Sequence, residues 1–153
     1  MTQPSRFHIR PIAGEDHAEW SALYADYARF YAVNQSVAMR EQVWQWLHQP
    51  SPAIFALVAV DAQGRLIGFA HYRAFVRPLA ASMGGYLDDL FVASAVRGQG
   101  VGTALIKAVV QIGQLQGWSV IRWVSAEDNQ LACACDDKLA RHTGWQTYEI
   151  SLK

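Results

Sequence analysis

A glycine-rich turn between an apolar run and a helical pattern constrains this chain more than any other feature. The turn reads Arg97-Gly98-Gln99-Gly100-Val101-Gly102-Thr103, the apolar run before it covers 86–92, and the helical pattern covers 103–116. Glycines at alternate positions leave backbone N–H groups uncovered at the positive end of a helix dipole. The segment therefore predicts a strand, a turn and a helix that together bind a phosphate group.

Two common phosphate-binding motifs do not fit this turn. A dinucleotide-binding fingerprint needs glycine at the position of Thr103 and an acidic residue at the end of a following strand. A P-loop needs Gly-Lys-Ser/Thr to close the turn, and the sequence has no such ending here. A nucleotide-binding domain of either kind is therefore disfavoured.

Composition predicts one domain and excludes several kinds of partner. The 153 residues, 52% of them hydrophobic, are enough for one substantial core, so residues 1–153 are expected to form a single domain. Thirteen basic and thirteen acidic residues give no net charge, which disfavours a nucleic-acid partner. No apolar run reaches the roughly 18 residues of a membrane span, and residues 1–5 do not resemble a signal peptide, so we expect a cytoplasmic protein without a membrane partner. The five histidines show no metal-ligand spacing, and no metal is expected.

Periodicity and turn residues predict an α/β fold. Asp16 and Glu19 are spaced as a capping box at the start of a helix with an aromatic face, and Gly117 is placed to end the helix that follows the glycine-rich turn. Residues 76–85, with Pro78 and the pair Gly84-Gly85, are expected to form a loop. Further helices are expected over 39–48 and 130–142, and strands over 7–11, 53–60, 65–75, 86–92, 118–124 and 145–152.

Three motifs in this order resemble the GNAT acyl-CoA N-acyltransferases. They are Leu-Asp-Asp-Leu-Phe-Val at 87–92, the glycine-rich turn, and Glu-Asp-Asn-Gln-Leu-Ala at 127–132. The polyamine and HPA2-like acetyltransferases are the most similar subgroup. The resemblance implies a single GNAT domain whose central sheet is mixed, mostly antiparallel and splayed, with flanking helices. It also implies an N-acetyltransferase that uses acetyl-CoA as co-substrate, and a homodimer is expected because homodimers are common in the family.

The resemblance assigns the cofactor-binding residues. The backbone of the strand before the turn would pair with the pantetheine arm, and the turn would hold the pyrophosphate, with Arg97 adding a positive charge. Asn129 would contact the cofactor near the thioester, and it is also a good helix N-cap. The predicted cofactor-binding residues are Leu90, Phe91, Val92, Arg97, Gly98, Gln99, Gly100, Val101, Gly102, Thr103 and Asn129.

The two predicted catalytic residues are Asp88 and Asp136. Asp88 and Asp89 are adjacent on a strand, so one is expected on each side of the sheet, and the resemblance assigns the proton-acceptor role to Asp88. Asp136 stands where the subgroup usually has a tyrosine that protonates the CoA thiolate. Either Asp136 is a protonated acid in a dry site, or water or another hydroxyl replaces it, or the protein turns over slowly. The candidate hydroxyls are those of Tyr86, Ser125 and Tyr148.

The acceptor is predicted from charge near the motifs. Six of the thirteen acidic residues lie at or beside them, which favours an amine that arrives as a cation, although acids near a helix N-terminus are also stabilising by themselves. The prediction is direct acetyl transfer, in a ternary complex, to a primary amine of a small cationic molecule or a lysine-like acceptor. An acyl-CoA-binding regulatory domain with little turnover is the alternative. The six are Asp88, Asp89, Glu127, Asp128, Asp136 and Asp137.

Overall fold

A computed structural model gives the architecture of the chain. It describes residues 6–126 and 128–153, and for 130–134 it describes the backbone alone. The chain divides into two compact units, Met1–Trp123 and Val124–Lys153, and each is treated by itself. The prediction of a single domain over the whole chain stays a prediction.

The first unit is built on a five-stranded mixed sheet in the order β1-β2-β3-β4-β5. The first four strands pair antiparallel, and β5 lies parallel to β4. A helix connects these two parallel strands, as expected for a crossover. The strands are β1 (Phe7–Pro11), β2 (Phe55–Asp61), β3 (Leu66–Arg77), β4 (Ser82–Val92) and β5 (Ile121–Arg122).

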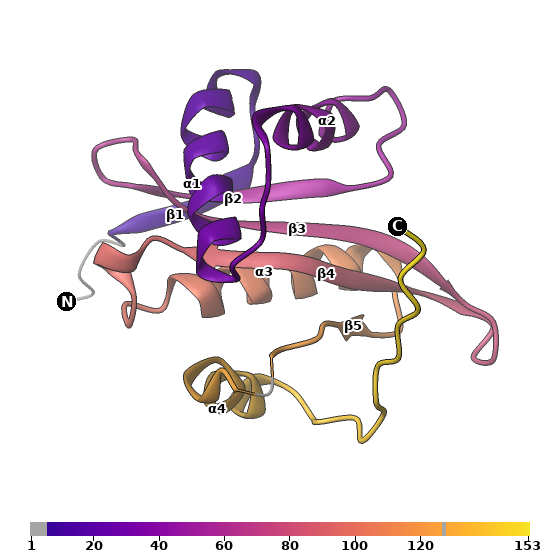
Figure 1. Cartoon of the computed structure of the whole chain (residues 1–153). Coiled ribbons are helices and arrows are strands. Elements are labelled where there is room, and N and C mark those ends of the chain that lie inside the picture. Colours follow the sequence, from indigo (N-terminus) through magenta and orange to yellow (C-terminus); the bar gives the residue numbers. More distant parts are fainter. Residues whose placement is uncertain (1–5, 127) are drawn as a thin grey trace. The chain divides into compact units, whose positions relative to one another are not determined.

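Helices cover both faces of this sheet, as Figure 1 shows. On one face lie α1 (His17–Phe30), preceded by the short helix η1 (Gly14–Asp16), and α2 (Val37–Leu47). On the other face lies α3 (Val101–Gln116), which follows β4 and the short helix η2 (Ser94–Val96). The predicted α/β fold with a mixed, mostly antiparallel sheet is confirmed.

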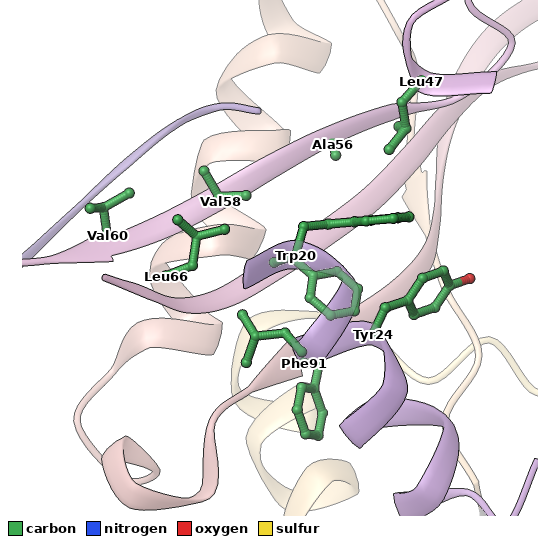
Figure 2. Close-up of a cluster of buried hydrophobic side chains, with 10 residues drawn as sticks. Trp20, Tyr24, Leu47, Ala56, Val58, Val60, Leu66 and Phe91 are labelled. Atoms are coloured by element: carbon green, nitrogen blue, oxygen red, sulfur yellow. The ribbon is translucent and has the colours of Figure 1, made fainter. Parts of the chain in front are cut away.

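Each face of the sheet has its own core. Trp20 and Tyr24 of α1 pack against Val58 of β2 and Phe69 of β3, and Figure 2 shows several of these side chains together. The core under α3 is mainly aliphatic and includes Val101, Leu105 and Val109, all buried. We refer to the two sides as the α1 face and the α3 face.

The predicted start of α1 is wrong in its detail. Neither Asp16 nor Glu19 caps the helix. Asp16 instead accepts hydrogen bonds from the Ala13 N–H and from both terminal nitrogens of Arg10, at 2.6 and 2.9 Å, while Glu19 accepts from the Leu66 N–H at the start of β3. The two acids therefore connect the start of α1 to β1 and β3. Asp16 gains a charged partner in Arg10 and Glu19 gains a backbone N–H of β3, and a local cap would provide neither.

The predicted loop at 76–85 is also wrong over most of its length. The strands β3 and β4 extend through it, and only 78–81 form the turn. Gly84 and Gly85 lie inside β4, where a Cβ would come within 2.8 Å of the Phe75 ring and 2.4 Å of the Trp118 ring. These glycines serve close packing against rings and make no turn.

The second unit contains α4 (Gln130–Leu139). The predicted helix over 130–142 is thus confirmed with an earlier end, whereas the predicted strand over 145–152 is absent from the described residues of this unit. Its apolar side chains, such as Trp145 and Ile150, are exposed. A strand needs a neighbour for its backbone hydrogen bonds, and the described part of the unit holds no second strand to provide one.

Candidate active site

A β-bulge in β4 determines how the two adjacent aspartates are presented. His71 of β3 pairs with Asp89 of β4, and the next residue of β3, Tyr72, pairs with Leu87. Asp88 therefore has no pairing partner in β3 and is the extra residue of the bulge. A bulge re-aims side chains that would otherwise alternate across the sheet. The carboxylate of Asp89 contacts His71, and that of Asp88 contacts Arg73, two residues further along β3 and on the same face. The expectation of one carboxylate on each side is wrong, because both lie on the α1 face.

Asp89 is held by several hydrogen-bond donors. Its Oδ2 accepts from His71 Nδ1 at 2.8 Å and from the Tyr24 hydroxyl at 3.1 Å, and the Tyr27 hydroxyl is a further partner. Burial alone would raise the pKa of this carboxyl, but the hydrogen bonds from His71, Tyr27 and Tyr24 together outweigh burial and hold the pKa below its usual value. Asp89 is therefore a largely buried, ionised group.

The two tyrosines around Asp89 remain donors. Burial raises the pKa of Tyr24 and of Tyr27 well above the usual value, and the Asp89 charge raises both further. The side chain of Gln35, on the connection between α1 and α2, lies at the Tyr24 hydroxyl. Its buried Oε1 has no hydrogen-bond partner among the residues that the structure describes. One buried acceptor atom beside the Tyr24 hydroxyl is therefore left without a partner.

Asp88 has a different environment. Its two carboxylate oxygens accept from Nε of Arg73 at 3.2 and 3.0 Å, and its side chain is 27% exposed against 18% for Asp89. Burial holds the pKa of Asp88 above its usual value, against the opposing effect of Arg73, and the charge of Asp89 adds to the rise. Of the two carboxylates, Asp88 is therefore the better proton acceptor near neutral pH.

Sequence reasoning missed the residue that links this cluster to the core. His71 is completely buried, and its Nε2 lies 3.0 Å from the indole nitrogen of Trp20. A polar residue inside the otherwise apolar run 66–72 was the signal available in the sequence. Its partners Trp20 and Asp89 are distant in sequence, so only the fold brings the three together.

The strand that carries Asp88 has an unpaired edge beyond the bulge. Among the described residues, β5 pairs with β4 only at Gly85 and Tyr86, so the sheet splays after Tyr86. The Ala93 N–H donates to Ile67 O in the direction of β3. By antiparallel alternation, the N–H groups of Leu90 and Val92 face the open edge, whereas that of Phe91 faces β3. Leu90 and Val92 are thus placed to pair with an extended ligand, while the Phe91 ring is buried in the α1-face core.

The glycine-rich turn has the conformation expected of an anion site. Gly98 and Gly100 have φ of 81° and 85°, and nothing lies within 4 Å of a Cβ built at either. Gly100 precedes the first turn of α3, where no side chain caps the N–H groups of Val101, Gly102 and Thr103. Arg97 donates through Nε to Val92 O, and its guanidinium lies over the rings of Phe30 and Phe91. The turn leaves space and donors for a phosphate, and Gln99 is exposed within it.

Two predicted site residues belong to the second unit. Asn129 precedes α4, and its N–H donates to Ala126 O. Asp136 lies in α4, and its carboxylate accepts a hydrogen bond from the Ser125 hydroxyl. The structure therefore gives Asp136 a local partner, and that partner is one of the hydroxyls considered as a substitute acid.

Comparison with known proteins decides the family. The model of the acetyltransferase (GNAT) family matches residues 20–139. The chain belongs to this family. It is 26% identical over 145 residues to the D-amino-acid N-acetyltransferase HPA3 of Saccharomyces cerevisiae, a match that covers 94% of this chain and 90% of that protein. As a GNAT protein, the chain is an acetyl-CoA-dependent N-acetyltransferase that acts on amines.

Solved GNAT structures share the fold. The ribosomal-protein-alanine N-acetyltransferase of Brucella melitensis superposes with a TM-score of 0.80 at 22% identity, covering 97% of this chain and all (100%) of the other. AAC(6')-Iy, in complex with the bisubstrate analogue CoA-S-monomethyl-acetylneamine, gives 0.83 at 19% identity, with 97% and 99% covered. Within the described residues, no helix is long and apolar enough to cross a membrane, and no three metal-binding side chains lie close enough to hold an ion.

Proposed function

We propose that the chain transfers an acetyl group from acetyl-CoA directly to a primary amine of a small cationic molecule or a lysine-like acceptor, in a ternary complex. Asp88 takes the proton of the acceptor ammonium, directly or through one water. The freed amine nitrogen forms a bond to the thioester carbon, the carbon–sulfur bond breaks, and its electron pair leaves on the CoA sulfur. The nitrogen loses a second proton as the amide forms, and the sulfur takes up one proton, so the protons balance.

The β4 bulge is the observation that carries this proposal. It puts two carboxylates with unlike environments on one face of the strand whose next residues have an unpaired edge. An acceptor amine at Asp88 and an extended thioester arm along Leu90 and Val92 would meet at this point of β4. Binding both substrates on one strand supports direct transfer without an acyl-enzyme.

The acceptor amine has recognisable partners at the α1-face cluster, by which we mean the connected side chains of Asp88, Asp89, His71, Arg73, Tyr24 and Tyr27. The carboxylate of Asp88, which is 27% exposed, attracts an ammonium. Two cationic side chains lie on neighbouring strands, since Arg73 and Arg122 both pair with Tyr86, one from each side. The guanidinium group of Arg73 lies over the Tyr86 ring and that of Arg122 over the Phe75 ring. They suit an acceptor with an anionic group beside its amine, and HPA3 is named for D-amino acids. Amino-acid acceptors are therefore included in the test.

The cofactor end of the proposal rests on the glycine-rich turn. Backbone N–H groups from Gln99 to Thr103 would bind the pyrophosphate at the N-terminus of α3, with Arg97 adding charge. Asn129 would contact the cofactor near the thioester, and Asp136 would act at the departing sulfur. A homodimer and a cytoplasmic location stay predictions from the sequence.

The test is free-thiol release from acetyl-CoA against a panel of amines, with CoA affinity measured in parallel. The panel contains a polyamine, D- and L-amino acids, an aminoglycoside and a lysine-rich peptide, and an N-acetylated form of each serves as the matched control. The proposal requires release that depends on a free amine. CoA binding without release from any acceptor would contradict it and favour a regulatory acyl-CoA-binding domain.

A further inference from the structure

The buried histidine has a protonation state that its partners determine. The indole nitrogen of Trp20 is a donor only, so His71 Nε2, 3.0 Å away, must be the acceptor and carry no proton. The proton of the neutral ring then lies on Nδ1, which donates to Asp89 Oδ2 at 2.8 Å. Three residues from α1, β3 and β4 thus form one directed chain of hydrogen bonds that ends on a carboxylate.

The surroundings of this chain reinforce its direction. His71 is enclosed by the rings of Trp20, Tyr24 and Phe69, with no exposed surface, so water cannot replace the Trp20 donor. Asp89 faces His71 from β3, the hydroxyls of Tyr24 and Tyr27 from α1, and Asp88 on its own strand. His71, Tyr24 and Tyr27 each donate a hydrogen bond to Asp89, whereas Asp88 donates none. A carboxylate with this set of donors is stabilised in its charged form.

We propose that Trp20 and His71 are positioning residues that keep Asp89 ionised, so that its neighbour Asp88 is the one carboxylate of the pair that takes up the proton of the acceptor amine. This inference rests on the proposed function. Neither residue touches the substrates. A fixed negative charge beside Asp88 makes protonation of Asp88 easier, and Arg73, on its other side, opposes this. The histidine is neutral and is not itself the base.

The first test reads the histidine itself. Nitrogen NMR of ring-labelled wild-type protein is expected to show the Nδ1–H tautomer of His71 at neutral pH. A proton on Nε2, or a doubly protonated ring, would overturn the proposal. This measurement needs neither acetyl-CoA nor an acceptor, so it is independent of whether the protein transfers acetyl groups.

The second test follows Asp88 in variants of the chain. The carboxyl carbon of Asp88 is titrated by NMR in wild type, Trp20→Phe and His71→Leu. In Trp20→Phe, Nε2 of His71 loses its donor and can take up a proton, and the positive charge offsets that of Asp89. In His71→Leu, Asp89 loses a hydrogen-bond donor and becomes protonated more easily. Both changes remove charge beside Asp88, so its midpoint is expected to move to lower pH by about one unit. The acidic limb of kcat/KM is expected to move with it.

Two further variants separate positioning from packing. Phe69→Leu disturbs a ring that packs on His71, at 4.8 Å between centroids, but removes no hydrogen bond, so its Asp88 midpoint should match wild type. His71→Asn keeps an N–H donor for Asp89, and its midpoint is expected to stay near the wild-type value. An unchanged midpoint in folded Trp20→Phe or His71→Leu, or an equal shift in Phe69→Leu, would overturn the proposal. If wild type releases no thiol, the proposed function fails, while the tautomer and the midpoints still decide the hydrogen-bond chain.

Discussion

The two faces of the sheet differ in kind. The α1 face buries rings together with a histidine, and both aspartates of β4 reach it. The α3 face buries mainly aliphatic side chains, and among the described residues its core holds no buried charged group. The strands β2, β3 and β4 contribute side chains to the cores of both faces. Under our proposal, the α1 face carries the proton chemistry, whereas the α3 face serves mainly as a scaffold that carries the phosphate-binding turn at the start of α3.

The first prediction concerns that turn and has the largest expected effect. Gly100→Glu should lower CoA affinity by at least about a hundredfold, because it adds a negative side chain where a phosphate is expected. Gly64→Glu is the matched control, since Gly64 has a similar positive φ of 81° and equally open space in the β2–β3 turn. Calorimetric titration with CoA would measure both. Equal affinities in the two variants would contradict the assignment of the turn.

The second prediction concerns the scaffold. Leu105→Ala removes a fully buried side chain from the α3-face core and should lower the free energy of unfolding by about 3 kcal/mol. The rate of acetyl transfer per folded molecule should not change, because Leu105 belongs to the α3-face core, which is separate from the core of the α1 face. Denaturant unfolding and single-turnover rates would be measured together. A large loss of the acetyl-transfer rate in the folded protein would contradict the distinction between the two faces.

The third prediction uses the opposite pKa shifts of the two aspartates. The pKa of Asp89 is lowered in the folded protein, so its ionisation stabilises the fold above the usual carboxyl pKa of about 4, and this contribution is lost as pH falls through the folded pKa. Asp89→Asn should therefore destabilise at pH 7 and much less at low pH. The pKa of Asp88 is raised, so Asp88→Asn should not destabilise in this way. Unfolding free energies across pH test this, and the same pH dependence in both variants would refute the division.

The fourth and smallest expected effect concerns Asp136. If the role of the acid at the CoA sulfur is vacant, Asp136→Tyr should raise the transfer rate by roughly three- to tenfold. Asp137→Tyr, one position along α4, is the matched control. Steady-state thiol release compares them, and a slower Asp136→Tyr enzyme would instead give Asp136 a positive role, together with its Ser125 partner.

The features of the fold and of the site that could be predicted from the sequence are those that depend on neighbouring residues. The glycine-rich turn and the end of α3 at Gly117 depend on neighbouring residues, and both are found as predicted, with φ of 85° at Gly100 and 76° at Gly117. The bulge at Asp88 depends on register with another strand, so strict alternation placed the carboxylates on opposite faces. Gly84 and Gly85 look like a turn in sequence because the rings of Phe75 and Trp118 that require them lie elsewhere in the chain.

The partners of His71 were beyond prediction for the same reason. The hydrogen bond from Trp20 spans 51 positions and that to Asp89 spans 18, and no periodic pattern encodes either. Sequence reasoning predicted the aromatic face of α1, of which Trp20 and Tyr24 are buried and Phe30 and Tyr31 are exposed, but it could not place the Trp20 indole N–H. Likewise, Asp16 and Glu19 had the spacing of a cap, and only the fold offered them Arg10 and the Leu66 N–H.

The most direct test of the account compares wild type with Asp88→Asn in a single-turnover assay, at saturating acetyl-CoA and with the best acceptor of the panel. The variant should bind CoA as wild type does and stay folded, yet transfer the acetyl group at least about a hundredfold more slowly at neutral pH, because it has lost its proton acceptor. A rate equal to that of wild type would contradict the assignment of the proton chemistry to the α1 face of β4.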